Sequence, residues 1–189
     1  RAGGDTSNVY LELNGGDKLE ATVGEESKEM TKAQDLLNVI WYSASFDEDE
    51  ADTAIKVAFS RSVDDSAPES TVTLPPKFNL IAPEEDASFS RADDDITVTW
   101  IDSTGSGDDM ILSVNGDCIR LYTKNLDVVS GTAVIEAGDI KTSENEEAKT
   151  CKVTLELKRR RAGTIDDAYG EGGVFYGSQV RIVDIKSAP

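Results

Sequence analysis

Histidine is absent from the 189 residues of this chain, and its absence removes a large set of enzyme chemistries. Ser-His-Asp and Cys-His nucleophilic sites need an imidazole base, and the common zinc sites use imidazole ligands. Neither a P-loop nor a GxGxxG motif is present to bind a nucleotide. Glycoside hydrolysis uses a pair of carboxylic acids, but among 37 Asp and Glu residues some pair is always present. Such a pair is therefore no indication of a glycosidase here. The sequence therefore predicts a non-enzymatic protein without an organic cofactor.

Basic residues and long apolar runs are also scarce. The 19 Lys and Arg residues leave a formal charge of −18, which argues against nucleic-acid and anionic-lipid partners, because phosphate binding needs clustered cations. No apolar run approaches the roughly 18 to 20 residues that span a bilayer, so no membrane span is expected. The sequence is also compatible with a lipid anchor or an export signal on a segment that preceded Arg1 and was removed.

The acidic surplus has two interpretations. It is either a solvated surface, as in marine, halophilic or secreted proteins, or a set of carboxylates that holds calcium. None of the acidic clusters has the spacing of an EF-hand loop. The best calcium candidates lie before and after one predicted strand, where loops converge, and they are Asp93, Asp94, Asp102, Asp108 and Asp109. The alternative is that these are solvated turn residues that discourage pairing of sheet edges.

The prolines divide the chain. Pro68, Pro75, Pro76 and Pro83 cluster in the middle, where they disfavour a helix or a central strand. We therefore place a boundary near Pro75 and Pro76, with a small mainly-β domain at 1–76 and a second domain at 77–189.

The first domain is expected to begin with a β-hairpin. Alternating runs at 9–13 and 18–23 flank Asn14-Gly15, a strong hairpin turn signal. Met30, Ala33 and Leu37 recur at helical spacing, so the sequence predicts one short helix over 27–38. The remaining predicted strands of this domain are 38–46, 54–60 and 70–74.

The second domain carries the clearer β pattern. Ile96, Val98 and Trp100 alternate along one strand and are expected to share a buried face. Regularly spaced short strands of this kind indicate a β-sandwich of about seven strands. The predicted strands are 78–83 (at a sheet edge), 95–101, 110–114, 118–123, 132–136, 148–158 and 174–185.

Cys118 and Cys151 are the only cysteines, and each lies in a predicted strand. A disulfide between them would contribute roughly 3 to 4 kcal/mol by closing the intervening loop. Cys151 is expected to share the core face with Val153. Cys118 reaches that face only if 115–117 forms a three-residue loop with Gly116 at positive φ. The pair favours a periplasmic, cell-surface or extracellular location, and the alternative is two buried thiols in the cytosol.

Residues 78–100 resemble the opening strands of immunoglobulin-like modules in bacterial secreted and cell-envelope proteins. There "LIAP" ends a first strand at Pro83, and "ASFSRADDDITVTW" ends a second strand at Trp100. The resemblance implies an immunoglobulin-like β-sandwich and an exported compartment, and it transfers no site residues. It departs from antibody domains, because Trp100 precedes both cysteines instead of lying between them.

Two segments are candidates for ligand binding. The run Arg159, Arg160 and Arg161 is either an anion or acidic-polysaccharide contact, or part of an ion-pair network with Glu156, Asp166 and Asp167. Tyr169 and Tyr176 lie in a glycine-rich segment, which is typical of a binding loop for sugars or peptides. The alternative is a corner in which the glycines turn the chain.

These patterns predict an exported module of the cell envelope or a secreted protein, with a structural, adhesive or ligand-binding role. Its expected partner is a protein or a glycan. The alternative is a carbohydrate-binding module or the accessory domain of an extracellular enzyme.

Overall fold

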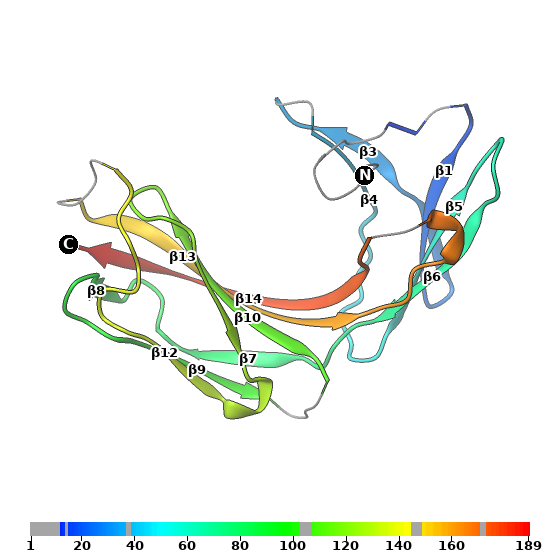
Figure 1. Cartoon of the computed structure of the whole chain (residues 1–189). Coiled ribbons are helices and arrows are strands. Elements are labelled where there is room, and N and C mark those ends of the chain that lie inside the picture. Colours follow the sequence, from blue (N-terminus) through cyan, green and yellow to red (C-terminus); the bar gives the residue numbers. More distant parts are fainter. Residues whose placement is uncertain (1–11, 14, 37–38, 103–106, 145–148, 171–172) are drawn as a thin grey trace. The chain divides into compact units, whose positions relative to one another are not determined.

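The computed structural model describes residues 12–13, 15–36, 39–102, 107–144, 149–170 and 173–189. Throughout these residues the chain is built from β-strands, and its only helical pieces are two 3₁₀ turns, η1 (Val128–Ser130) and η2 (Asp167–Tyr169) (Figure 1). The predicted all-β class is confirmed.

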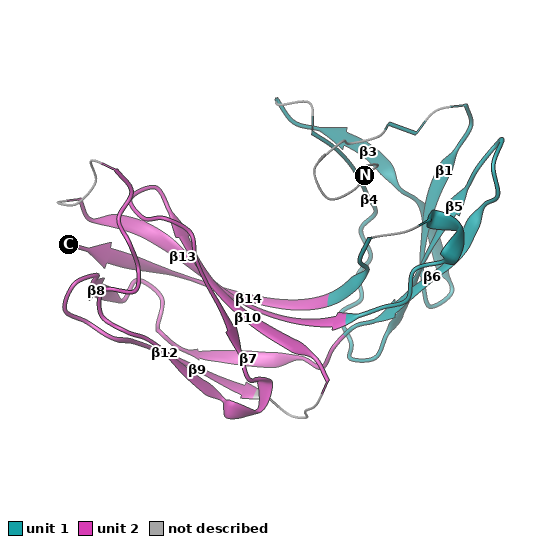
Figure 2. Ribbon diagram, in the orientation of Figure 1, with its two compact units in different colours: residues 1–74, 162–177 teal, residues 75–161, 178–189 magenta. Residues whose placement is uncertain are grey.

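The chain forms two compact units, which Figure 2 shows in separate colours. Unit 1 comprises residues 1–74 and 162–177, and unit 2 comprises residues 75–161 and 178–189. The first change of unit falls between Leu74 and Pro75, at the start of the proline pair. The sequence-based division at 76 had left 162–177 with the second domain, whereas this segment belongs to unit 1.

Unit 1 contains a four-stranded sheet in the order β2-β1-β5-β6 and a separate hairpin, β3-β4. Alternation of apolar and polar residues predicted β1 and β5 with the bounds that they have. The strands of unit 1 are β1 (Lys18–Val23), β2 (Glu26–Glu29), β3 (Thr31–Gln34), β4 (Ile40–Ser43), β5 (Ala54–Ser60) and β6 (Ala67–Thr73). The first strand of the predicted hairpin, 9–13, lies mostly outside the described residues.

The predicted helix over 27–38 is wrong for the part of it that the structure describes. These residues form β2 and β3, and Glu29 of β2 lies opposite Glu20 of β1. Met30 continues the pairing by donating its backbone N–H to the carbonyl of Leu19 at 2.8 Å. Helical spacing of three apolar residues is a weak local preference, and backbone pairing with a neighbouring strand overrides it.

The segment 162–177 joins unit 1 through the backbone of β6. Thr71 and Thr164 exchange two backbone hydrogen bonds, of 2.9 and 2.8 Å. Glycine is required beside this bridge, since a Cβ on Gly163 would lie 2.4 Å from the carbonyl oxygen of Thr71. A Cβ on Gly177 would likewise lie 2.4 Å from the carbonyl oxygen of Thr73.

Unit 2 contains two sheets, ordered β11-β10-β13-β14-β8 and β12-β9-β7. The edge position predicted for 78–83 is confirmed, because β7 lies at the end of the smaller sheet. The strands are β7 (Phe78–Ala82), β8 (Ser88–Ser90), β9 (Ile96–Asp102), β10 (Asp109–Gly116), β11 (Tyr122–Leu126), β12 (Thr132–Ile135), β13 (Cys151–Ala162) and β14 (Tyr176–Ala188). The first residues of β14 and the last of β13 belong to unit 1.

The two sheets of unit 2 face each other across one apolar core (Figure 2). Trp100 is 2% exposed, Val98 is fully buried, and the indole N–H of Trp100 donates to the carbonyl of Val128 at 3.2 Å. The core residues follow the predicted alternation along β9 and β13, and those buried on these two strands are Ile96, Val98, Trp100, Val153, Leu155 and Leu157.

The predicted loop over 115–117 is wrong. β10 continues through Gly116, and Val114 lies opposite Tyr122, so Cys118 belongs to the connection between the strands. Gly116 does not have positive φ. Glycine is needed there for another reason, since a Cβ would lie 2.6 Å from Cγ1 of Val153.

The first residues of unit 2 contribute to both sheets. β7 pairs antiparallel with β9 in the smaller sheet. After Pro83 the chain crosses over, and β8 pairs parallel with β14 in the larger sheet, with Phe89 opposite Ser187. Parallel pairing of an early strand with the final strand holds the end of the chain against the larger sheet.

Candidate functional site

The predicted disulfide between Cys118 and Cys151 is present, with an S–S distance of 2.07 Å. Cys118 is fully buried in the core of unit 2, whereas Cys151 is only partly buried at the start of β13. The bond joins the connection after β10 to β13 and needs no short hairpin loop.

Arg91 lies beside this disulfide, and no pattern in the sequence singles it out. It follows β8, it is 8% exposed, and its guanidinium donates to Sγ of Cys118 at 3.5 Å. The same group donates to the carbonyl and hydroxyl of Ser187, at 3.0 and 3.1 Å, and to the carbonyl of Lys149 at 3.0 Å. A single arginine in an acidic loop has no motif that would reveal these contacts.

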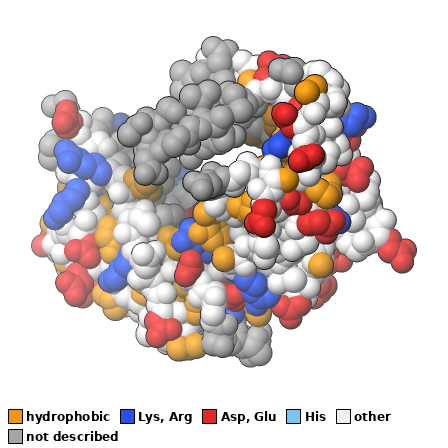
Figure 3. Space-filling model, turned by 45° about the vertical axis from the view of Figure 1, so that its right-hand side comes forward, with side chains coloured by type: hydrophobic (Ala, Val, Ile, Leu, Met, Phe, Trp, Pro, Cys, Tyr) orange, Lys and Arg blue, Asp and Glu red, His pale blue; other side chains and the backbone are white. Residues whose placement is uncertain are grey.

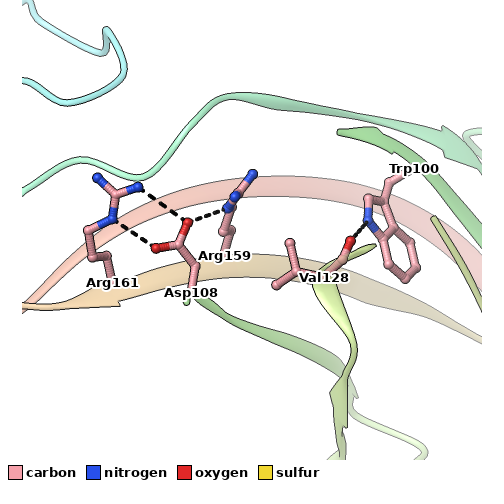
Figure 4. A network of polar contacts seen from close by, with 5 residues as sticks. All are labelled: Trp100, Asp108, Val128, Arg159 and Arg161. Atoms are coloured by element: carbon pink, nitrogen blue, oxygen red, sulfur yellow. Dashed lines mark hydrogen bonds and ion pairs between the residues drawn. The ribbon is translucent and has the colours of Figure 1, made fainter. Parts of the chain in front are cut away.

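The arginine run forms ion pairs within unit 2, centred on Asp108 (Figure 4). One carboxylate oxygen of Asp108 accepts from Nε of Arg159 at 2.7 Å, and the other accepts from Nε of Arg161 at 2.8 Å. The side chains of Arg159 and Asp108 are 1% and 2% exposed. Arg160 points to the outer face of the sheet, where Asp109 accepts from its Nε at 2.9 Å.

The position of these arginines follows from strand alternation. Arg159 continues the core-facing positions of Leu155 and Leu157, so its charge enters the protein interior and needs a carboxylate there. Met110 lies opposite Arg159 in the sheet, which brings Asp108 within reach. Of the acids suggested from sequence, Glu156 pairs with Lys158, whereas Asp166 instead accepts backbone N–H groups in unit 1. The geometry favours the ion-pair interpretation of the run.

The four calcium candidates whose side chains the structure describes make other contacts. Asp94 accepts the backbone N–H of Ser90 at 2.8 Å, and Asp93 contacts the hydroxyl of the same serine at 3.5 Å. Asp108 and Asp109 are paired with arginines, and the side chain of Asp102 lies outside the described residues. No group of three or more Asp, Glu or Cys side chains gathers as metal ligands in the part of the chain that the structure describes.

The two candidate tyrosines lie in unit 1, each 36% exposed. The ring of Tyr169 packs on that of Phe59, with centroids 5.6 Å apart, and the guanidinium of Arg61 lies 4.6 Å from the centroid of Phe59. Burial raises the pKa of the Tyr169 hydroxyl, and the positive charge of Arg61 partly offsets this rise. Tyr169 is therefore partly exposed while its ring packs on Phe59.

A hollow of about 520 Å³ opens beside the arginine cluster in unit 2. Asp109, Arg160 and Val129 contribute to its lining, and Val129 is 69% exposed. Its charged lining consists of Asp108, Asp109, Asp127 and Arg160, and Asp108 and Asp109 are paired with arginines.

The outer face of the larger sheet carries a second polar contact. The carboxylate of Asp184 accepts from the hydroxyl of Thr154 at 2.7 Å and lies 2.8 Å from Nζ of Lys152. The hydrogen bond from Lys152 is the main cause of a lowered pKa for Asp184, and the same bond raises the pKa of Lys152.

Figure 3 shows acidic and basic side chains interspersed on the visible face with uncharged and apolar groups. No protein-family model matches the chain, and no curated protein matches it. Within the described residues, no helix has the length and apolar character needed to cross a membrane.

Proposed function

We propose that this chain is a non-enzymatic module of a secreted or cell-envelope protein, with a structural, adhesive or ligand-binding role. The observation that carries the proposal is the Cys118–Cys151 disulfide, which joins two segments of the unit 2 core. Disulfides of this kind form and persist in the periplasm, at cell surfaces and outside cells, whereas cytosolic thiols are kept reduced.

The strand order of unit 2 supports an immunoglobulin-like sandwich. In immunoglobulin lettering, β7, β9 and β12 correspond to A, B and E, and the larger sheet reads C′, C, F and G from β11 to β14. Two features depart from antibody domains. Trp100 lies on the strand equivalent to B, and the disulfide joins the connection after C to the start of F. The proposal is therefore an immunoglobulin-like arrangement with its own disulfide position.

The compartment is tested by the oxidation state of the protein isolated from its native source. Samples are alkylated before and after reduction under denaturing conditions, and their intact masses are compared. An exported protein is expected to gain two alkyl groups only after reduction. Two groups added without reductant would overturn the exported assignment.

A carbohydrate-binding role is the second candidate, and the packing of Tyr169 on Phe59 favours it. An aromatic residue that is 36% exposed and packs on a second ring suits stacking on a sugar. A glycan array with wild-type protein, Tyr169→Ala and Tyr176→Ala separates the candidates. Selective binding that either tyrosine substitution abolishes would overturn a purely structural role, and Val174→Ala, at an exposed residue of the same segment, is the matched control.

Calcium binding remains a separate proposal, because one candidate side chain lies outside the described residues. Titration calorimetry on chelator-treated protein tests it. Heat of binding together with a higher melting temperature would support a calcium site, whereas no heat and an unchanged melting temperature would end the proposal.

A further inference from the structure

The two sulfurs of the disulfide in unit 2 differ in accessibility. Cys118 is 0% exposed and lies among core residues, whereas Cys151 is only partly buried at the first position of β13. Cys151 is therefore the more accessible half of the disulfide, and attack by a dissolved thiol is expected at its Sγ. Attack on Cys151 makes Cys118 the leaving group.

Arg91 is placed to stabilise that leaving group. Its guanidinium donates to Sγ of Cys118 at 3.5 Å, so a thiolate formed on Cys118 has a cation beside it from the start. Three further contacts, to Ser187 and to the carbonyl of Lys149, fix the guanidinium in this position. A neighbouring arginine favours the thiolate over the thiol, and a leaving thiol that ionises more easily departs faster.

We propose that Cys151 is a site of reversible modification by low-molecular-weight thiols, with Arg91 acting on the leaving Cys118. The thiolate sulfur of the attacking molecule forms a bond to Sγ of Cys151. The Cys151–Cys118 bond breaks, and its electron pair stays on Cys118. The product is a mixed disulfide on Cys151 and a thiolate on Cys118 beside Arg91.

Two steps can follow. The Cys118 thiolate re-forms the original disulfide by attacking Sγ of Cys151 and expelling the small thiolate. Alternatively, a second thiol attacks the sulfur of the bound group, which releases a small-molecule disulfide and leaves both cysteines reduced. Complete reduction thus oxidises two equivalents of thiol to one disulfide. This inference depends on the geometry around the cystine and not on the proposed function.

The first test locates the mixed disulfide in the wild-type protein. Folded protein is treated with β-mercaptoethanol and is then trapped with acid. The β-mercaptoethanol thiolate carries a single negative charge, so the charge of −18 repels it less than a multiply charged thiol. Peptide mass spectrometry is expected to find the adduct on Cys151. An adduct mainly on Cys118 would overturn the proposed direction of attack.

The second test measures the rate of reduction by dithiothreitol in Arg91→Met and Arg91→Lys. The Met variant keeps a long side chain but loses the charge, so its reduction should be about tenfold slower than in wild type. The Lys variant should lie between them. If Arg91 only held the fold together, Arg91→Met would open the core and speed reduction, so an equal or faster rate would overturn the proposal.

A third measurement does not need the disulfide. In Cys151→Ser protein, the thiolate absorbance of Cys118 is followed as the pH is raised, with and without the additional Arg91→Met change. The absorbance should rise at lower pH when Arg91 is present. Coincident curves would contradict the role given to this arginine.

Discussion

Asp108 shows how one residue can make a charged side chain tolerable in a core. Its carboxylate is 2% exposed and accepts hydrogen bonds from Arg159 and Arg161. Removing one member of such a pair takes away the opposite charge that offsets the desolvation of the other, which costs far more free energy than the pair contributes by itself.

We expect Asp108→Asn to lower the free energy of unfolding by about 3 to 5 kcal/mol, because it removes the anion between two arginines. Urea unfolding followed by tryptophan fluorescence measures this change. The matched control is Asp109→Asn, whose side chain is 61% exposed in its contact with Arg160. Loss of this exposed ion pair should lower the free energy of unfolding by about 1 kcal/mol or less. Equal effects of the two substitutions would contradict the importance of burial.

Asp184 and Lys152 make stability depend on pH in opposite directions. The pKa of Asp184 is lowered from 3.8, mainly by the hydrogen bond from Lys152, so its contribution is present above the unfolded pKa. That contribution is lost as the pH falls through the folded pKa. The pKa of Lys152 is raised from 10.5, so its contribution is present below that value and is lost as the pH rises through the folded pKa.

We therefore expect Asp184→Asn to shift the urea midpoint downward by a constant amount near neutral pH. The gap from wild type should close in acid below pH 3.8. It should narrow in alkali above pH 10.5, where Lys152 loses its charge while Thr154 still donates to the carboxylate. The control Asp117→Asn removes a negative charge from an exposed residue elsewhere. Its difference in urea midpoint from wild type should not show this dependence on pH. A gap that persists unchanged into acid would show that the carboxylate has another role.

At the scale of elements, the attachment of 162–177 to β6 depends on two glycines. A side chain at Gly163 would meet a backbone carbonyl, which cannot rotate away as a flexible side chain can. The two backbone hydrogen bonds between Thr71 and Thr164 lie directly beside this contact.

Gly163→Ala is expected to destabilise the protein by about 1 to 3 kcal/mol and to break the Thr71–Thr164 bridge. Native-state hydrogen exchange should then be faster at the amides of these two threonines. Gly116→Ala introduces a comparable overlap with Val153 in unit 2 and serves as the control. If both variants speed exchange at Thr71 and Thr164 equally, the effect is global and the local interpretation is wrong.

At the scale of the whole molecule, the charge of −18 dominates the electrostatics. Like charges on the surface repel one another in the folded state, and dissolved salt screens this repulsion. The contact between Asp108 and Arg159 is buried and is screened much less.

The melting temperature should therefore rise by about a few degrees when the ionic strength increases from about 0.01 to 0.5 M. Differential scanning calorimetry measures this shift. Choline chloride at equal ionic strength is the control, and it should reproduce the effect of sodium chloride if screening is the cause. A melting temperature that falls or stays constant would show that surface repulsion is a minor contribution.

Local patterns along the chain were enough to predict the all-β class. β1, β5 and β9 were found because alternation of apolar and polar residues reflects burial of one face of a strand. The Cys118–Cys151 pairing was also predicted, since two cysteines in strand patterns have no other partner. The buried positions of Trp100 and Leu155 follow from the same two-residue period.

The tertiary structure alone decided which segments meet. Residues 26–29 became a strand because β1 offers backbone partners, and residues 31–34 became a strand because β4 does. No local pattern encodes a distant hydrogen-bonding edge. Pairing between distant segments also explains why 162–177 belongs to unit 1. It likewise explains why Cys118 lies in the connection after β10 and not opposite Val114, where the three-residue loop would have placed it. Asp108 and Arg159 are far apart in sequence, and Arg91 meets Cys118 only through the fold. The two-residue alternation of apolar and polar side chains in a sequence indicates which residues of a strand are buried. Which buried groups contact each other depends on how strands that are distant in sequence pair.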